Sequence, residues 1–154
     1  MALQQYLRPE LVFVCEDMAS RDALFEQISK AAGAAEPDLD GAALLRHLLA
    51  REKQSPTSTP EGVAFPHALA PDIDRTLVAA ARVKSGVDFG VPSHPPADLI
   101  LCMFGNSDEP WEHVRILARL ARLVHTDEAR DRLRTADDPD RLYALLLDED
   151  RSHE

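Results

Sequence analysis

Asp98-Leu99-Ile100-Leu101-Cys102-Met103-Phe104 is a short run in which six apolar residues follow one aspartate. A run of this length and character is typical of a central strand buried on both faces, as found in sheets that carry helices on each side. The run therefore favours a layered α/β fold. Segments on both sides of it along the chain support this interpretation.

Two earlier segments are also expected to be strands. Leu11 to Cys15 is short and β-rich, and Thr76 to Lys84 is rich in β-branched residues and alanine. Between them, residues 53–62 contain two prolines, a glycine and four hydroxyl residues without periodicity, which indicates a loop. This loop leads directly into Val63-Ala64-Phe65-Pro66-His67.

Two helices are expected before the loop. The first begins after Ser20, a good N-cap residue, and ends at Gly33, where a glycine accommodates the left-handed conformation. The second begins near Asp40 and reaches Glu52. Its apolar face consists of Leu44, Leu45, Leu48 and Leu49.

Three further helices are expected after the central strand. Their starts are marked by acidic, hydroxyl or proline residues at Asp108-Glu109-Pro110, Thr126-Asp127 and Asp138-Pro139. Strands that alternate with helices, followed by a helical tail, predict an α/β layer fold. The chain has no internal repeat and no second domain boundary, so we expect residues 1–154 to form a single domain.

The charge balance bears on the kind of partner. The chain has 17 basic and 27 acidic residues, a formal net charge of -10. Nucleic-acid binding is therefore not expected, because a phosphate backbone requires a basic footprint. The charge favours a basic protein partner, or it only keeps the protein soluble.

The sequence predicts a cytoplasmic protein without a membrane segment. No stretch approaches the ~20 apolar residues of a membrane span, and the N-terminal residues lack a basic region followed by an apolar one. Cys15 and Cys102 each lie in an apolar run, where a free thiol packs as a small hydrophobic group. We expect both to be reduced and inert.

The sequence motifs leave histidine as the candidate reactive group. None of the six histidines forms an H-x-x-x-H or H-E-x-x-H pair, so a zinc site is not expected. The chain also lacks a glycine-rich phosphate loop, a G-x-S-x-G elbow and a C-x-x-C motif. No metal or cofactor is therefore predicted.

His67 is the candidate nucleophile. It follows Pro66 at the end of an apolar run, which would hold the imidazole in a fixed orientation at the rim of a sheet. A neutral imidazole is a good nucleophile near pH 7, since its ordinary pKa is about 6.5, and it suits reversible attack on phosphorus. The alternative is a loop histidine without a chemical role.

Two other side chains are candidates for binding a phosphoryl group. His113 lies in the first turn of a predicted helix, where the dipole disfavours the imidazolium form and favours a nearby anion; the alternative is a helix-surface histidine without such a role. Arg51 ends the second helix, and its guanidinium could neutralise a phosphoryl group or only complement the helix C-terminus. A stripe at helical spacing, typical of a solvated face balanced by carboxylates, consists of Arg115, Arg119 and Arg122.

Several motifs occur together in an order that resembles a known family. The motifs are Leu49-Ala50-Arg51-Glu52-Lys53, Gly62-Val63-Ala64-Phe65-Pro66-His67, Val87-Asp88-Phe89, Ala97-Asp98-Leu99-Ile100-Leu101 and the leucine-rich helix led by His113. In this order they resemble enzyme IIA of the fructose–mannitol class of the bacterial sugar phosphotransferase system, including its nitrogen-regulatory branch.

The resemblance implies a mixed β-sheet flanked by helices and a phosphocarrier function. It implies that His67 takes phosphate from phospho-HPr through its outer ring nitrogen, that His113 lies beside it, and that Arg51 and the Thr57 hydroxyl surround the phosphoryl group. The acceptor would be a IIB domain or a regulated protein. The alternative is a non-enzymatic binding module of the same fold that regulates a kinase, a transporter or transcription.

The chain departs from the family pattern around the candidate nucleophile. The glycine-rich approach common in the family is replaced by Pro56-Thr57-Ser58-Thr59-Pro60-Glu61-Gly62. Ala68 replaces the common glycine after the histidine, and Phe65 replaces an aliphatic residue. These changes predict a stiffer and more acidic loop, with slower transfer or an unusual partner.

Overall fold

A five-stranded mixed sheet forms the centre of the protein in a computed structural model that describes residues 2–153. Three strands, β1 (Leu7–Cys15), β4 (Leu77–Val87) and β5 (Ala97–Asn106), lie side by side in that order. β4 runs parallel to β1 and antiparallel to β5. Two short strands, β2 (Val63–Ala64) and β3 (His67–Ala70), both pair in parallel with the other edge of β5. The predicted mixed α/β sheet is confirmed.

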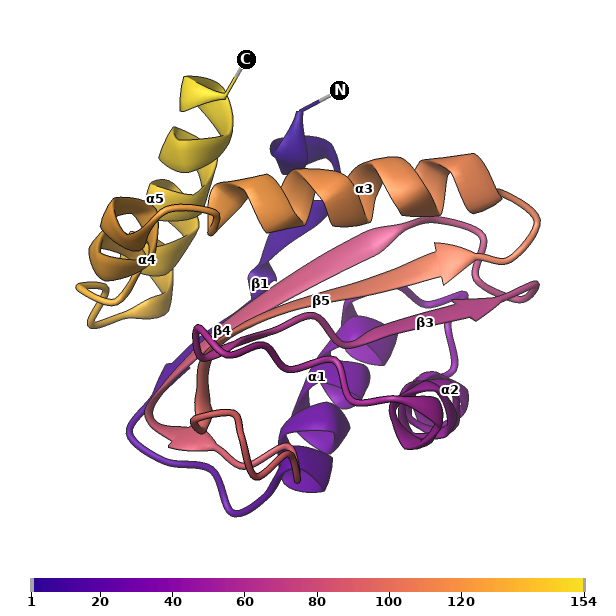
Figure 1. The fold of residues 1–154 in the computed structure, drawn as a ribbon. Helices are drawn as coiled ribbons and strands as arrows, with labels where there is room; N and C mark the ends of the chain where they lie inside the picture. Colours follow the sequence, from indigo (N-terminus) through magenta and orange to yellow (C-terminus); the bar gives the residue numbers. More distant parts are fainter. Residues whose placement is uncertain (1, 154) are drawn as a thin grey trace.

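Helices cover both faces of the sheet (Figure 1). Two of them, α1 (Arg21–Ala35) and α2 (Gly41–Gln54), pack on one face. On the other face lie α3 (Pro110–Leu123), α4 (Asp127–Leu133) and α5 (Pro139–Ser152), beside the short 3-10 helix η1 (Leu3–Gln5). The sheet therefore separates two apolar cores.

Strand β5 contributes to both cores, as the sequence predicts. Its residues from Leu99 to Phe104 are all at most 3% exposed. Because side chains alternate along a strand, one set packs against the α1–α2 layer and the next set against the α3–α5 layer. The first set is Ile100, Cys102 and Phe104, and the second is Leu99, Leu101 and Met103.

The predicted helix starts are confirmed, but the predicted end of α1 is wrong. The Ser20 hydroxyl accepts a hydrogen bond from the Ala23 amide at 3.0 Å, and the Asp40 carboxylate accepts one from Ala42 at 3.0 Å. Gly33, however, lies inside α1, which continues to Ala35. A Cβ at Gly33 would lie 2.9 Å from the Gly41 amide nitrogen, so this glycine permits close approach of α2.

Strand β1 begins at Leu7, earlier than the predicted Leu11, because Leu7 already pairs with Val78 of β4 at this edge of the sheet. This edge carries Pro9 and Glu10, both exposed, which is how natural sheets block pairing with another chain. Both cysteines are free, with Cys102 buried and Cys15 half-buried. Burial raises the pKa of both thiols.

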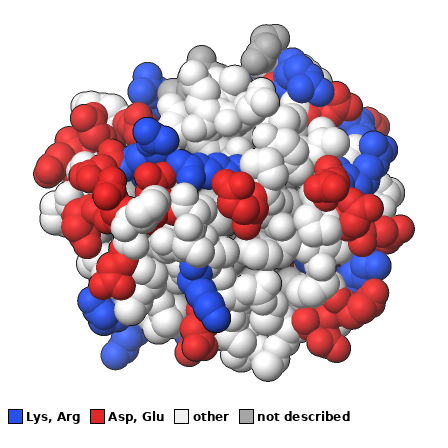
Figure 2. Space-filling model, turned by 180° about the vertical axis from the view of Figure 1, so that it is seen from behind, with Lys and Arg blue, Asp and Glu red and all other residues white. Residues whose placement is uncertain are grey.

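Acidic and basic side chains are interspersed on one face of the molecule (Figure 2). On the face opposite to that of Figure 1, acidic side chains gather along both margins with basic ones among them, and the middle of the face is mostly uncharged (Figure 2). Among residues 2–153, no helix is both long enough and apolar enough to cross a membrane.

Candidate functional site

Three elements bring the candidate residues together at the edge of the sheet. His67 is the first residue of edge strand β3, Arg51 lies in the last turn of α2, and His113 lies in the first turn of α3. Since α2 and α3 cover opposite faces, the site lies where the two layers meet beside β3 (Figure 1). A hollow of about 380 Å³ is lined by His47, Ala50, Arg51, Gln54, His67, Leu69 and His113.

Hydrogen bonds select one tautomer of His67. Its Nδ1 lies 2.9 Å from the Phe65 carbonyl oxygen, which can only accept, so the proton is on Nδ1. The Arg51 Nε donates to His67 Nε2 at 3.1 Å. Nε2 therefore carries the lone pair and lies on the side of Arg51. This is the outer ring nitrogen named by the sequence hypothesis.

His113 lies beside His67, although 46 positions separate the two residues along the chain (113 − 67 = 46). Their ring centroids are 5.2 Å apart, with an angle of 49° between the ring planes. The Nδ1 atom of His113 is buried and has no hydrogen-bond partner within the described residues. Its amide donates to the Glu109 carbonyl at 3.3 Å, so the ring is carried by the first turn of α3.

Both imidazoles have a lowered pKa, which favours the neutral form. Burial lowers the pKa of His67, and the nearby Arg51 charge lowers it further, while the Phe65 hydrogen bond and Glu52 act in the opposite direction. Burial also lowers the pKa of His113, with further contributions from His67 and Arg51. A ring with a lowered pKa keeps its lone pair at neutral pH.

Arg51 connects His67 to the end of its own helix. Besides the bond from Nε to His67, its Nη1 donates to the Ser55 carbonyl at 2.8 Å. The guanidinium is half-buried and retains further donors. This arrangement combines both roles considered from the sequence, complementing the α2 C-terminus and offering a positive charge beside the histidine.

Thr57, which the resemblance places around the phosphoryl group, is bonded to Glu52 in this structure. Its hydroxyl donates to Glu52 Oε1 at 2.6 Å and its amide donates to Glu52 Oε2 at 2.7 Å. Its carbonyl accepts a bond from the Phe65 amide at 3.1 Å. The structure thus brings His67, His113 and Arg51 together at the hollow, whereas the Thr57 hydroxyl is bonded to Glu52.

Glu52 is a site residue to which the sequence analysis gave no role. Its side chain is only 2% exposed, although it is a carboxylate. Both of its oxygens hold Thr57, which in turn holds Phe65, whose carbonyl orients His67. The sequence contains a signal for the burial of Glu52, because it follows Leu44 and Leu48 at i, i+4 spacing on the buried side of α2.

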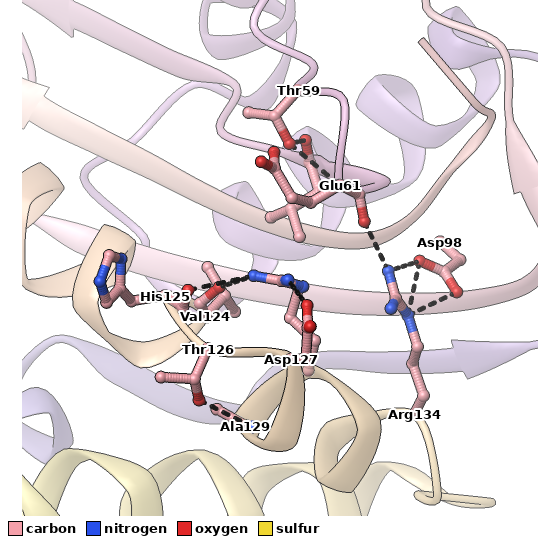
Figure 3. Close-up of polar contacts among 11 residues, drawn as sticks. Thr59, Glu61, Asp98, Val124, His125, Thr126, Asp127, Ala129 and Arg134 are labelled. Atoms are coloured by element: carbon pink, nitrogen blue, oxygen red, sulfur yellow. Dashed lines mark hydrogen bonds and ion pairs between the residues drawn. The ribbon is translucent and has the colours of Figure 1, made fainter.

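The loop before the nucleophile is fixed at several further points. The Ser58 hydroxyl lies 2.9 Å from His94 Nδ1. The Thr59 hydroxyl donates to the Val63 carbonyl at 2.8 Å, and Arg134 donates to the Glu61 carbonyl at 2.8 Å while it also pairs with Asp98 (Figure 3). The loop is therefore anchored by side chains at several points.

Gly62 supplies the conformational freedom that this loop needs. Its φ of +78° lies in the left-handed region, and the space for a Cβ is limited by Arg134. Within residues 2–153, no three histidine, cysteine or acidic side chains come together as a metal-binding group.

These features define a class of protein. An imidazole with a fixed tautomer, a second imidazole and a guanidinium beside a sheet edge are together suited to reversible phosphoryl transfer to histidine. Sequence comparison agrees, since the family described as phosphoenolpyruvate-dependent sugar phosphotransferase system, EIIA 2, matches residues 5–149. The chain belongs to this family.

Known relatives fall in both branches of the family. The chain is 28% identical over 146 residues to a nitrogen regulatory protein of Pseudomonas aeruginosa, covering 95% of each chain. It is similar to the crystal structure of nitrogen regulatory protein IIA-Ntr from Neisseria meningitidis, with a TM-score of 0.82, 26% identity, and coverage of 91% of this chain and 95% of that one. The fold also matches enzyme IIA for mannitol from Escherichia coli, solved in complex with phosphorylated enzyme IIB, with a TM-score of 0.74, 21% identity, and coverage of 91% and 97%.

Proposed function

We propose that this protein is a phosphocarrier in which His67 Nε2 accepts a phosphoryl group from phospho-HPr. The observation that carries the proposal is the pair of bonds on the His67 ring. The Phe65 carbonyl holds the proton on Nδ1, which leaves the Nε2 lone pair on the side of the hollow. The family membership supports the same role.

The transfer exchanges one nitrogen–phosphorus bond for another. The Nε2 lone pair of His67 attacks phosphorus, the bond from phosphorus to the donor histidine breaks, and its electron pair returns to the donor ring. His67 keeps its Nδ1 proton, so its phosphorylated ring carries positive charge. The Phe65 carbonyl, which accepts that proton's hydrogen bond at 2.9 Å, stabilises this form.

Arg51 has two roles in this proposal. Before transfer, its Nε donates a hydrogen bond to the lone pair of His67 Nε2 at 3.1 Å, so this hydrogen bond must break as phosphorus approaches. The guanidinium then lies within reach of the phosphoryl oxygens and offsets their charge. His113, whose neutral ring lies beside His67 at the start of α3, is placed to donate a hydrogen bond to one of those oxygens.

Thr57 has a positioning role in the proposal. Its hydroxyl is bonded to Glu52, and its carbonyl accepts a hydrogen bond from the Phe65 amide, so Thr57 fixes the Phe65 backbone. The resemblance implies a direct contact of this hydroxyl with the phosphoryl group, which would require the bond to Glu52 to break.

The acceptor defines two versions of the function. One is a IIB domain, the partner of the Escherichia coli mannitol enzyme IIA in its solved complex. The other is a protein regulated by the phosphorylation state, a version favoured by two relatives named nitrogen regulatory proteins. In both versions the protein is cytoplasmic and meets its donor and its acceptor there without inserting into a membrane.

Intact mass measurement tests the proposal. Incubation with phosphoenolpyruvate, enzyme I and HPr is expected to add one phosphoryl group to the wild-type chain and none to His67→Ala. The matched control is His125→Ala, which replaces an exposed histidine outside the hollow and keeps labelling at the wild-type level. Labelling of His67→Ala at the wild-type level would overturn the assignment.

A further inference from the structure

The outer face of α3 presents a mixed basic and apolar surface. We define it by Trp111, Val114, Arg115, Ala118 and Arg122, all of which are exposed. Trp111, Arg115, Ala118 and Arg122 follow i, i+4, i+7, i+11 spacing, so they lie along one side of the helix. The opposite side buries Ile116, Leu120 and Leu123 against the sheet.

The sequence predicts that the stripe of Arg115, Arg119 and Arg122 is balanced by carboxylates. In the part of the chain that the structure describes, only one of these arginines has a carboxylate partner. Arg119 donates to Asp150 through Nε at 2.5 Å and through Nη2 at 3.0 Å. Arg115 and Arg122 are exposed, and the side chain of neither makes an ion pair or hydrogen bond within residues 2–153. The single acidic residue of α3, Glu112, accepts a bond from the Thr76 hydroxyl instead.

The same surface is hollowed and carries exposed apolar area. A hollow of about 350 Å³ is lined by Arg115, Ala118, Arg119 and Arg122. At the start of the helix, Trp111 is 78% and Val114 is 54% exposed, two of the three large hydrophobic side chains that are exposed in the described chain. Tryptophan and arginine are the residues most enriched among interface hot spots, so their combination on one helix face indicates a contact surface.

We propose that the outer face of α3 is a docking surface for an acidic segment of another protein that also carries an apolar residue. Carboxylates of this segment would pair with Arg115 and Arg122, which suit bidentate recognition, and its apolar side chain would cover Trp111. Charge complementarity favours such a segment over a nucleic acid. A short segment can place its few carboxylates at the two arginines alone, whereas a duplex carries one charge per ~1.7 Å along its length and would also meet the acidic residues of a protein of net charge -10.

This docking surface is distinct from the hollow around His67. His113 follows Trp111 by two residues, about 200° around the helix, and its side chain faces His67 on the inner side. The proposal therefore does not rest on phosphoryl transfer. It predicts that changes at Arg115 and Arg122 leave phosphorylation of the protein intact.

Fluorescence anisotropy with a synthetic peptide tests the docking surface. The probe is a labelled helical peptide of glutamate and leucine about as long as α3, and its control has lysine in place of glutamate. Binding of the glutamate peptide is expected to weaken at least about tenfold in Arg115→Glu/Arg122→Glu, and also in Trp111→Ala. The matched variant Lys30→Glu/Arg141→Glu makes the same charge change at exposed sites on α1 and α5, and binding there is expected to change less than about twofold.

Each other outcome contradicts the proposal. These outcomes are no binding of the glutamate peptide by the wild-type protein, equal binding of the lysine peptide, or an equal loss in the matched variant. A labelled DNA duplex that binds more tightly than the peptide, and is lost in Arg115→Glu/Arg122→Glu, would assign the surface to nucleic acid instead. Phosphorylation assayed on the same variants keeps this result separate from any failure at His67.

Discussion

The chemistry of the candidate site depends on a few atoms around the His67 ring. The Phe65 carbonyl fixes the proton on Nδ1, and Arg51 contacts Nε2. The sequence could suggest His67, because a histidine after proline at the end of an apolar run has a fixed backbone. It could not show the tautomer or the position of Glu52, because both depend on contacts that form only when the loop packs against α2.

Titration of His67 tests the electrostatics at the residue scale. Because burial and the Arg51 charge lower its pKa from the ordinary 6.5, we expect an NMR titration midpoint below that value. Removing the charge in Arg51→Met should raise the midpoint. Arg46→Met, an exposed change on the same helix, should leave it unchanged. A wild-type midpoint at or above 6.5 would contradict this account.

Replacement of Glu52 tests the chain of contacts that positions the nucleophile. In Glu52→Gln, an amide NH₂ group replaces one acceptor oxygen and faces a donor of Thr57, so we expect a loss of about 1–3 kcal/mol in the free energy of unfolding. Phosphoryl transfer should also slow, because the Phe65 carbonyl is held less firmly.

The control for this prediction is Glu26→Gln, an exposed change on α1 that should alter stability by at most about 0.5 kcal/mol. Urea unfolding measures both variants. Equal stability of Glu52→Gln and Glu26→Gln would show that the buried carboxylate is not needed to hold the loop.

At the scale of elements, the fold follows from local signals where the sequence contains them. The apolar run in β5 and the caps at Ser20 and Asp40 are such signals, and they predicted the central strand and two helix starts. Gly33 shows where local reasoning fails, since a glycine near a helix end is typical of a C-cap. Here the missing side chain of Gly33 permits close contact with Gly41 of the next helix, which no local sequence pattern reveals.

Substitution of Gly33 tests this explanation. Alanine usually stabilises a helix interior by about 1 kcal/mol relative to glycine. In Gly33→Ala, however, the new Cβ would lie 2.9 Å from the Gly41 nitrogen, so we expect a net loss of about 1–3 kcal/mol. Ala34→Gly, on the exposed side of the same helix, should lose about 1 kcal/mol through helix propensity alone. A stabilised Gly33→Ala would refute the proposed close contact.

At the scale of the whole molecule, one sheet supports two cores and holds the site at its edge. Arg51 and His113 come from helices on opposite faces, so the distance between them depends on the assembled layers (Figure 1). Sequence resemblance predicted their proximity, whereas composition and periodicity could not, because the contact joins distant parts of the chain. We propose that residues 1–154 unfold as a single cooperative domain.

The pH dependence of stability reports on this assembly. His67 and His113 have lowered pKa values in the folded protein, so below about pH 6.5 the unfolded chain binds more protons than the folded chain. The free energy of unfolding should therefore fall as the pH is lowered from 6.5 through the folded pKa values. Urea unfolding at pH 7.5 and pH 5.5 measures this fall. A variant with both histidines changed to glutamine should show a smaller fall in the free energy of unfolding. A fall as large as that of the wild-type protein would contradict the prediction.

The central claim is that His67 receives the phosphoryl group on Nε2, and one NMR measurement tests it directly. Protein labelled with ¹⁵N at histidine is phosphorylated by enzyme I and HPr, and the coupling of phosphorus to a ring nitrogen is recorded. Because the Phe65 carbonyl holds the proton on Nδ1 at 2.9 Å, the account predicts coupling to Nε2 of His67 with Nδ1 still protonated. Coupling to Nδ1 of His67, or to a nitrogen of another histidine, would contradict it.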